Sequence, residues 1–451
     1  MRTGSEALPA FYASGGSVHE RLGEVHAAID LRDPVWIAAV SDVALGERTR
    51  ALDALGPAAR AALPLFGMPF AVKDNIDVAG LPTTAGCPAF AYAPARSATV
   101  VERLERAGAV VLGKTNLDQF ATGLVGTRSP YGVPANPFDP AYIPGGSSSG
   151  SAVAVARGFV SFALGTDTAG SGRVPAGFTG TIGVKPTHGI ISAAGVVPAC
   201  RSLDCVSIFV RTLDEAALIL DVAAAPDPRD PFSRERPAAA AVGLAADPAR
   251  PFVFAVPLPE QRIFFGDDEA RDQFERSIAR LVARGGSALD VDLACCFEAA
   301  ALLYDGPFVA ERTAAVGDFV DAHPEAVLDV TRTIVQSGRR YSAVDTFSAL
   351  YELRALRNAA AEIFARAAIL VVPTSPTIYR ISQIEAEPFL YNSRLGTYTN
   401  FVNLLDLCAL AVPAGAYAGG VPIGVTFIAP AFADASLLAF ARRFLQEPPV
   451  A

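Results

Sequence analysis

The sequence has few of the residues that hold metal ions or form disulfide frameworks. Only four histidines and six cysteines occur among 451 residues. The histidines are scattered, none lies in an H-E-x-x-H pattern, and no two cysteines form a C-x-x-C pair. We therefore expect free thiols, no metal ion and no other cofactor.

The chain also lacks an excess of basic residues and long apolar runs. Lys and Arg number 37 against 46 Asp and Glu, a net charge of −9, which argues against nucleic acid or an anionic membrane as a partner. No apolar run reaches the roughly 18 residues that a spanning helix needs. Residues 1–16 lack the apolar centre of a signal peptide. These absences together predict a cytoplasmic protein.

What the chain does have is enough apolar sequence for a large core. Hydrophobic residues make up 51% and charged residues 18%, so disorder is not expected. The length is compatible with one large α/β unit. An amphipathic pattern over residues 99–107, followed by apolar residues 109–113, predicts a helix and then a buried strand.

Helical periodicity and short apolar runs predict further elements. Pro34 fits the first turn of a helix that opens at Asp33, and Gly306-Pro307 should kink a helix over 297–316. Residues 189–197 predict two short strands, 198–207 a loop and 224–252 a surface excursion. The other predicted helices cover 47–62, 152–157, 212–223, 267–284, 344–367, 400–407 and 434–445, and the other strands cover 65–72, 159–165, 252–257, 287–292, 368–372, 409–413 and 423–428.

The stretch from residue 145 to 187 carries two serine-bearing, glycine-rich loops, 145–151 and 166–172. A helix and a strand of opposite direction separate them, so the two loops should meet at one edge of a sheet. Each loop is flanked by apolar helix or strand, which argues against a flexible linker. Their glycines permit the close backbone approach that lets amide N–H groups face a ligand.

Five segments give this region a specific resemblance. They are Val72-Lys73-Asp74-Asn75, Gly145-Gly146-Ser147-Ser148, Gly165-Thr166-Asp167-Thr168-Ala169-Gly170-Ser171, Arg173-Val174-Pro175 and Gly183-Val184-Lys185-Pro186-Thr187. The pattern resembles the amidase signature family, whose members hydrolyse amides with a Ser–cis-Ser–Lys triad. The one departure in these segments is Ala169, where many members carry glycine.

The resemblance implies a role for each matching residue. Ser171 would be the nucleophile, Ser147 the bridging serine after a cis peptide bond, and Lys73 the base. The oxyanion hole would be formed by the backbone N–H groups of Thr168, Ala169, Gly170 and Ser171. The relay requires a neutral Lys73, so its pKa must fall by about 3 units from about 10.4. Burial can do this, provided that neither Asp74 nor Asp167 pairs with the amine.

The resemblance also implies the architecture. It predicts the α/β amidase signature fold, a large twisted mixed β-sheet covered by helices on both faces. We expect one domain over residues 1–451, with an N-terminal helical wrap (1–62), a signature core (63–215), and the rest of the sheet with the substrate-side helices (216–451).

Within the family, residues 115–123, 170–175 and 197–207 are most similar to allophanate hydrolases, which act on N-carboxyurea. Tyr304, Phe308 and Arg312 are spaced to share one helix face. Spacing alone favours an amphipathic surface helix with Arg312 in water. The resemblance instead implies that Tyr304 and Arg312 bind the substrate carboxylate, and it adds Gly123 to the substrate site.

The function expected from this resemblance is cleavage of allophanate to release ammonia in urea degradation. We expect the protein to form a homodimer and to be linked in function to a urea carboxylase. The resemblance also implies that the further C-terminal domain of full-length allophanate hydrolases is absent from these 451 residues. Three alternatives remain open: the amidase subunit of a tRNA-dependent amidotransferase, another small-amide amidase, and a non-catalytic scaffold that kept the fold.

Overall fold

A single mixed sheet of eleven strands runs through the residues that the computed structural model describes, 7–237 and 251–445. The strand order is β1-β3-β2-β4-β6-β5-β10-β11-β9-β7-β8. β2 is parallel to β3 and β4, and β7 is parallel to β8 and β9, whereas the other neighbours are antiparallel. The strands are β1 Trp36–Ala39, β2 Pro69–Lys73, β3 Val110–Thr115, β4 Phe162–Asp167, β5 Ile182–Lys185, β6 Cys205–Val210, β7 Phe252–Pro257, β8 Gly286–Val291, β9 Ile369–Pro373, β10 Leu407–Ala416 and β11 Pro422–Pro430.

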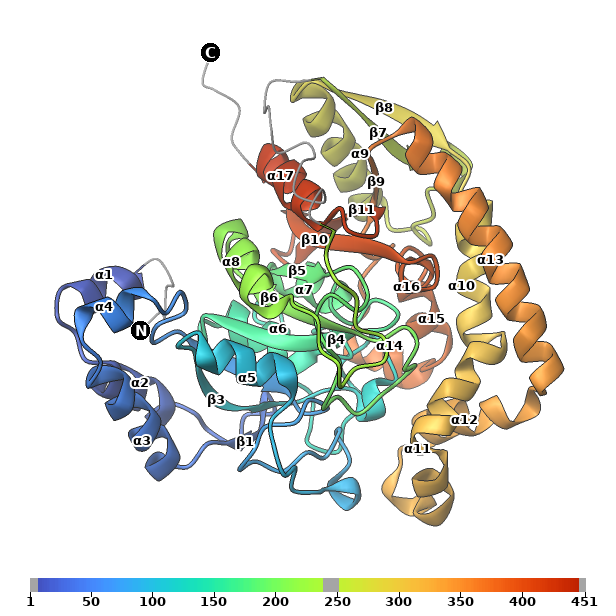
Figure 1. Ribbon diagram of the computed structural model, residues 1–451. Coiled ribbons are helices and arrows are strands. Elements are labelled where there is room, and N and C mark those ends of the chain that lie inside the picture. The colour runs from blue at the N-terminus through green and yellow to red at the C-terminus, as the bar shows by residue number, and fades with distance from the viewer. Residues whose placement is uncertain (1–6, 238–250, 446–451) are drawn as a thin grey trace.

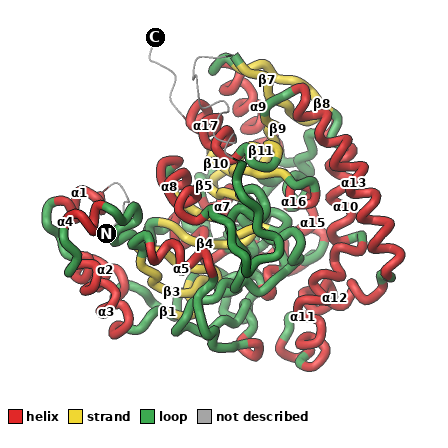
Figure 2. Tube along the Cα trace, in the orientation of Figure 1, coloured by secondary structure: helices red, strands yellow, loops and turns green. Residues whose placement is uncertain are grey.

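Helices cover both faces of this sheet (Figures 1 and 2). One face packs against α5 (Thr99–Arg106), α8 (Leu213–Ala223), α9 (Asp268–Ala283) and α17 (Asp434–Leu445). The other packs against α6 (Ser149–Ala156), α7 (Val174–Thr179), α10 (Ala294–Tyr304), α13 (Ala343–Arg366) and α16 (Phe401–Leu404). This arrangement confirms the predicted fold class.

The remaining helices lie at the periphery. Figure 1 shows the N-terminal group, α1 (Ala7–Ala13), α2 (Val18–Ala27), α3 (Asp42–Asp53) and α4 (Pro57–Ala61), to one side of β1 and β3. α11 (Ala310–Ala322) and α12 (Asp329–Ser337) extend beyond the end of α10, and α14 (Ile381–Ala386) and α15 (Leu390–Leu395) follow β9. Short 3₁₀ helices cover Pro88–Phe90, Gln119–Ala121, Pro259–Gln261, Pro307–Val309, Pro324–Ala326 and Gly338–Arg340.

Alternation along the central strands decides which face each helix can approach. Phe70 and Phe162 point toward the face of α5 and α8, where their rings stack with centroids 4.9 Å apart. Ala71 and Ala163 point the other way, toward α6, and their small side chains let that helix lie close to the sheet. Because β2 and β4 are parallel neighbours, their carboxyl ends reach the same edge, where α6 begins.

Most of the predicted elements are present within a few residues, but several predictions were wrong, and the helix predicted over 47–62 is divided between α3 and α4. Trp36 lies in β1, not in a helix, because it is buried at the sheet edge and pairs with Thr115 of β3. Residues 189–197 form turns with one isolated bridge, and Gly189 and Gly195 adopt positive φ there. The predicted loop 198–207 ends early, because β6 begins at Cys205.

The described residues include no helix long and apolar enough to cross a membrane. All six cysteines are free thiols, and five of them are buried. Residues 238–250 of the predicted excursion over 224–252 lie outside the described residues, and residues 224–237 form turns and irregular chain.

The aromatic contacts on the α17 side give a stability prediction. Phe427 is fully buried, and its ring centroid lies 4.8 Å from that of Phe440 and 5.3 Å from that of Phe444. Phe427→Ala should lower the free energy of unfolding by about 3–5 kcal/mol, measured by urea denaturation. Phe347, which is 58% exposed, is the matched control, and Phe347→Ala should change it by less than about 0.5 kcal/mol. Equal losses in both variants would contradict the assigned core.

Candidate active site

The predicted base and bridging serine lie in contact at the carboxyl end of β2. Lys73 is fully buried, and its Nζ lies 2.7 Å from Ser147 Oγ and 2.7 Å from Thr166 Oγ1. The peptide bond between Gly146 and Ser147 is cis, as the family resemblance implies. In its neutral form the amine can accept the Ser147 hydroxyl proton on its lone pair while it donates to Thr166.

The acidic neighbours of Lys73 in the sequence do not pair with it. Asp74 Oδ1 lies 3.0 Å from Lys114 Nζ, and Asp74 Oδ2 accepts the Thr84 amide at 3.0 Å. Asp167 pairs with Arg173. Among the described residues no carboxylate forms an ion pair with Lys73.

An amine in this position loses its charge easily. Burial lowers the pKa of Lys73 to about 7, although the charges of Asp118, Asp204 and Asp167 oppose the shift and Arg312 adds to it. The condition that the relay places on Lys73 is therefore met near neutral pH.

The loop that carries Ser171 is built around the carboxylate of Asp167. Arg173 donates to both carboxylate oxygens at 2.9 Å, and both side chains are fully buried. The amides of Gly170 and Gly172 donate to the same carboxylate at 3.0 Å each. Burial alone would raise the pKa of Asp167, but Arg173 holds it below its ordinary value. Ser171 is thus fixed between two anchored glycines, with its hydroxyl unbonded to any described residue.

The structure allows three of the four amides predicted for the oxyanion hole to take that role. Along the part of the loop that is described, the amides of Thr168, Ala169 and Ser171 donate to no protein acceptor. The Gly170 amide is already used by Asp167, so three N–H groups remain, not four. A side chain could not replace Gly170, because its φ is +134° and an added Cβ would lie 2.4 Å from Thr399 Oγ1.

The segment after β3, residues 116–128, closes the other side of the site. The Asp118 amide donates to the Ser147 carbonyl at 3.0 Å, and its carboxylate accepts the amides of Gly126 and Arg128. Phe120 and Ala121 both have φ of 52°, a conformation that costs non-glycine residues of order 1 kcal/mol each. Such strain persists only where surrounding contacts hold it, as at functional sites.

Gly123 lies in this segment beside Asp118. Its φ is +155°, and a Cβ there would lie 2.7 Å from Asp118 Oδ2. Its place in the substrate site stays a prediction. Asp118 and Thr166 were not predicted from the sequence as site residues, although both stand inside segments that carried the resemblance.

Tyr304 and Arg312 meet, but not on one continuous helix. α10 ends at Tyr304 and α11 begins at Ala310, because Gly306-Pro307 interrupts the predicted helix instead of only kinking it. Arg312 turns back so that Nη2 donates to the Tyr304 hydroxyl at 3.0 Å and Nη1 donates to Thr122 Oγ1 at 2.9 Å. Arg312 is buried and forms no ion pair with a described carboxylate, which excludes the solvated surface helix.

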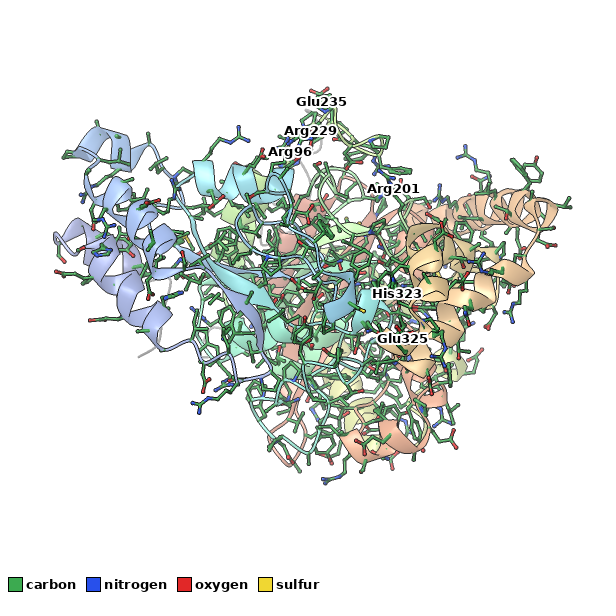
Figure 3. The ribbon with its side chains drawn as sticks, turned by 90° about the horizontal axis from the view of Figure 1, so that it is seen from below. Arg96, Arg201, Arg229, Glu235, His323 and Glu325 are labelled. Atoms are coloured by element: carbon green, nitrogen blue, oxygen red, sulfur yellow. The ribbon has the colours of Figure 1, made fainter. Side chains whose placement is uncertain are left out.

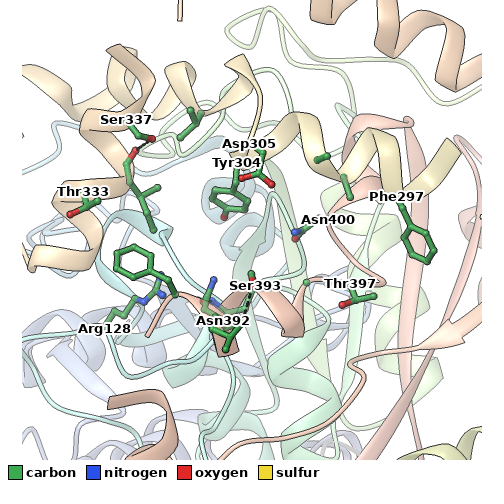
Figure 4. Close-up of a pocket in the computed structure, with 18 of the residues that line it drawn as sticks. Arg128, Phe297, Tyr304, Asp305, Thr333, Ser337, Asn392, Ser393, Thr397 and Asn400 are labelled. Atoms are coloured by element: carbon green, nitrogen blue, oxygen red, sulfur yellow. Dashed lines mark hydrogen bonds between the residues drawn. The ribbon is translucent and has the colours of Figure 1, made fainter. Parts of the chain in front are cut away.

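A cavity of about 570 Å³ opens beside this pair. Figure 4 shows Tyr304 on the helix above the opening and Arg128 on a loop below it. Arg128 is also buried, and its Nη1 donates to the Thr122 carbonyl at 3.0 Å. Two guanidinium groups therefore meet at Thr122. The region is suited to an anion, since an uncompensated buried cation is costly until an anion pairs with it.

Comparison with known proteins agrees with this geometry. The Amidase family model matches residues 25–438. Urea amidolyase of Saccharomyces cerevisiae is 44% identical over 419 residues, which cover 92% of this chain and 22% of that protein. One component of the glutamyl-tRNA(Gln) amidotransferase of Halobacterium salinarum is 35% identical, covering 83% of this chain and 94% of that protein.

The fold comparison gives the same picture. The structure of Kluyveromyces lactis allophanate hydrolase superposes with a TM-score of 0.90 at 43% identity, covering 95% of this chain and 69% of that one. This chain thus spans about a fifth of the length of the urea amidolyase it matches. From the match to nearly its whole length, and from the shared fold, we conclude that the chain belongs to the amidase family.

Proposed function

We propose that this protein hydrolyses allophanate (N-carboxyurea) to ammonia and N-carboxycarbamate through an acyl-enzyme on Ser171. The observation that carries the proposal is Arg312, a buried guanidinium that has no ion-pair partner among the described residues and donates to Tyr304. A small amide with a carboxylate at its far end would supply the missing anion, with a bidentate pairing open to the arginine. The similarity to proteins named allophanate hydrolase and urea amidolyase supports this substrate.

The reaction would use the contacts described above. Neutral Lys73 takes the Ser147 proton as Ser147 takes the proton of Ser171, whose oxygen attacks the amide carbonyl carbon. The amides of Thr168, Ala169 and Ser171 would stabilise the negative oxygen of the tetrahedral intermediate. The relay then returns the proton to the leaving nitrogen, and ammonia departs. Water enters, the same relay removes its proton, and Ser171 is released from the acyl group.

Two of the open alternatives belong to the same broad reaction class. The similarity to a glutamyl-tRNA(Gln) amidotransferase component makes glutamine a second candidate substrate, and the cavity beside Tyr304 has room for a larger amide. Ammonia release from allophanate and from glutamine, measured in parallel with malonate as competitor, separates these candidates. Faster turnover of glutamine would favour an amidotransferase role.

The comparisons also bear on the partners. This chain matches 26% of the Kluyveromyces lactis urea amidolyase chain with a TM-score of 0.91, so a similar unit occurs inside a larger protein. We infer a functional link to an enzyme that carboxylates urea, and we retain the homodimer as part of the proposal.

Tyr304 and Arg312, which we call the anion clamp, give the first functional prediction. Arg312→Ala should lower kcat/KM for allophanate by on the order of 100-fold, mainly through KM, because removing one partner of a buried charge pair costs about 2–5 kcal/mol. For biuret, in which the carboxylate is replaced by a carboxamide, the same substitution should lower kcat/KM far less. Arg32, exposed and paired with Asp30, provides the control variant Arg32→Ala. Equal losses on both substrates would refute the clamp.

The second prediction concerns the base. Lys73→Ala should reduce ammonia release by at least about a thousand-fold while the thermal midpoint stays near or above that of the parent, because the variant no longer buries an amine. Labelling of Ser171 by a fluorophosphonate probe should slow in parallel. Substantial turnover at pH 7 by this variant would remove lysine from the mechanism, and failure of the parent protein to label would revive the non-catalytic scaffold.

The third prediction is the pH dependence. Only the neutral amine can act as the base, and burial lowers the pKa of Lys73 to about 7. The labelling rate of Ser171 should therefore fall about tenfold per pH unit below pH 7 and level off above it. Arginine side chains stay charged across this range, so the clamp adds no alkaline limb. A flat profile from pH 5.5 to 8, or an inflection near pH 10, would contradict this assignment.

A further inference from the structure

We propose that Ser202 and Glu311 are positioning residues that set the distance between the oxyanion hole and Arg312, and thereby select substrates by length. They act through a short segment, residues 198–204, which we call the coupling loop. The proposal deepens the proposed function, and it rests on that function for the identity of the two ends of the substrate.

The inner end of the coupling loop holds the oxyanion hole. Thr168 donates its hydroxyl to Asp204 Oδ1 at 2.5 Å. The amides of Ala199 and Cys200 donate to the same carboxylate at 2.8 and 3.1 Å. Asp204 is therefore bonded on both oxygens within the site interior, where burial raises its pKa. Thr168, whose amide faces the reacting carbonyl in the proposed mechanism, is tied by its side chain to this loop.

The outer end of the same loop holds the helix that carries the clamp. The Ser202 amide donates to Glu311 Oε2 at 2.8 Å, and the Ser202 hydroxyl donates to Glu311 Oε1. The Cys200 thiol contacts the Phe308 carbonyl at 3.7 Å, just before α11 begins. Glu311 directly precedes Arg312 in α11, so the coupling loop contacts α11 at the residue next to Arg312.

The Glu311 side chain points away from Arg312, so its contact with the coupling loop does not compete with an ion pair to Arg312. Consecutive helix residues are about 100° apart around the axis and do not face each other. Arg312 turns toward Tyr304 and Thr122, whereas Glu311 turns toward Ser202. Among the described residues Glu311 forms no ion pair, so both its carboxylate oxygens are used by the coupling loop.

The middle of the loop has a further polar contact and packs into the core, because Asn403 Nδ2 donates to the Leu203 carbonyl at 2.9 Å and Ala199, Cys200 and Leu203 are buried. Arg201, between the two ends, is exposed, and Figure 3 shows it at the periphery of the molecule. A hollow of about 70 Å³ borders the loop near Arg229 and Asp230. The contacts to Thr168 and Glu311 are the polar contacts of this loop that connect the two groups proposed to bind opposite ends of the substrate.

The opposite wall of the site has its own connection, from Ser147 through Asp118 to Ala121 and Arg312. That wall joins the clamp to the bridging serine, while the coupling loop joins it to the oxyanion amides. A substrate would thus be measured between two fixed points. Removing the contact of Glu311 with the coupling loop should weaken the preference for one substrate length without abolishing binding, because the connection through Asp118 remains.

Dicarboxylates of different length test this directly. Malonate places two carboxylates about as far apart as the carbonyl and carboxylate of allophanate, and succinate is one methylene longer. We expect the parent protein to bind malonate more tightly, and Glu311→Ala to reduce the ratio of the succinate to the malonate inhibition constant at least about threefold. Glu311→Gln keeps one acceptor oxygen without the charge and should retain most of the ratio. A ratio unchanged in Glu311→Ala would overturn the proposal.

Controls separate length selection from general destabilisation. Ser202→Ala removes the hydroxyl contact alone and should shift the ratio in the same direction, which keeps the test usable if Glu311→Ala does not fold. Ser17 donates to Asp53 at 2.7 Å far from the site, so Ser17→Ala should lower the thermal midpoint and leave the ratio unchanged. A change as large in Ser17→Ala would assign the effect to stability and overturn the proposal.

The proposed function fails separately. If the parent protein releases no ammonia from allophanate, the substrate assignment is wrong, and calorimetric dissociation constants for the two dicarboxylates still give the ratio. If the parent is active and the ratio is insensitive to Ser202 and Glu311, only the coupling is wrong.

Discussion

The site depends on keeping one amine uncharged among several carboxylates. At neutral pH a free lysine is protonated, and a pKa lowered from 10.5 to about 7 corresponds to about 5 kcal/mol of differential solvation. Burial outweighs the opposing charges of Asp118, Asp204 and Asp167, and the two acids that stand beside the site in the sequence, Asp74 and Asp167, have cations of their own. Lys114 takes Asp74 and Arg173 takes Asp167. Were either cation lost, its carboxylate would stabilise the protonated amine, and the relay would have no acceptor.

The same ion pairs also build the geometry. Asp167 accepts from Arg173 and from two loop amides, so the charge that must be kept from Lys73 is used to hold Ser171 in place. This carboxylate leaves the Gly170 amide unavailable to the oxyanion, yet it fixes the three amides around it. The same bonds therefore keep the charge of Asp167 away from Lys73, the proposed base, and position Ser171, the proposed nucleophile, and both Asp167 and Arg173 are fully buried.

The sequence was sufficient for the parts of this site that stand in local motifs. The family resemblance of these motifs predicted Lys73, Ser147 and Ser171, and the parallel pairing of β2 and β4 brings the segments that carry them to one edge. It was insufficient where partners are distant in the chain. An exposed and a buried Arg312 have the same periodicity, so spacing alone could not show that Arg312 is buried against Thr122, 190 residues away, and Tyr304. Trp36 was misassigned for the same reason, since its strand exists only through pairing with β3.

The two buried basic side chains of the site, Lys73 and Arg312, act on each other. Arg312 contributes to the low pKa of Lys73, so its positive charge helps to keep the amine neutral. When a carboxylate pairs with the guanidinium, that contribution weakens, and the pKa of the amine rises toward its ordinary value. By linkage, the protonated amine would in turn favour the anion. An anionic substrate therefore moves the pH range in which the amine is neutral upward as it binds, whereas a neutral amide of the same shape would leave that range as in the free protein. Charge recognition at Arg312 and the protonation state of Lys73 are thus linked through one interaction.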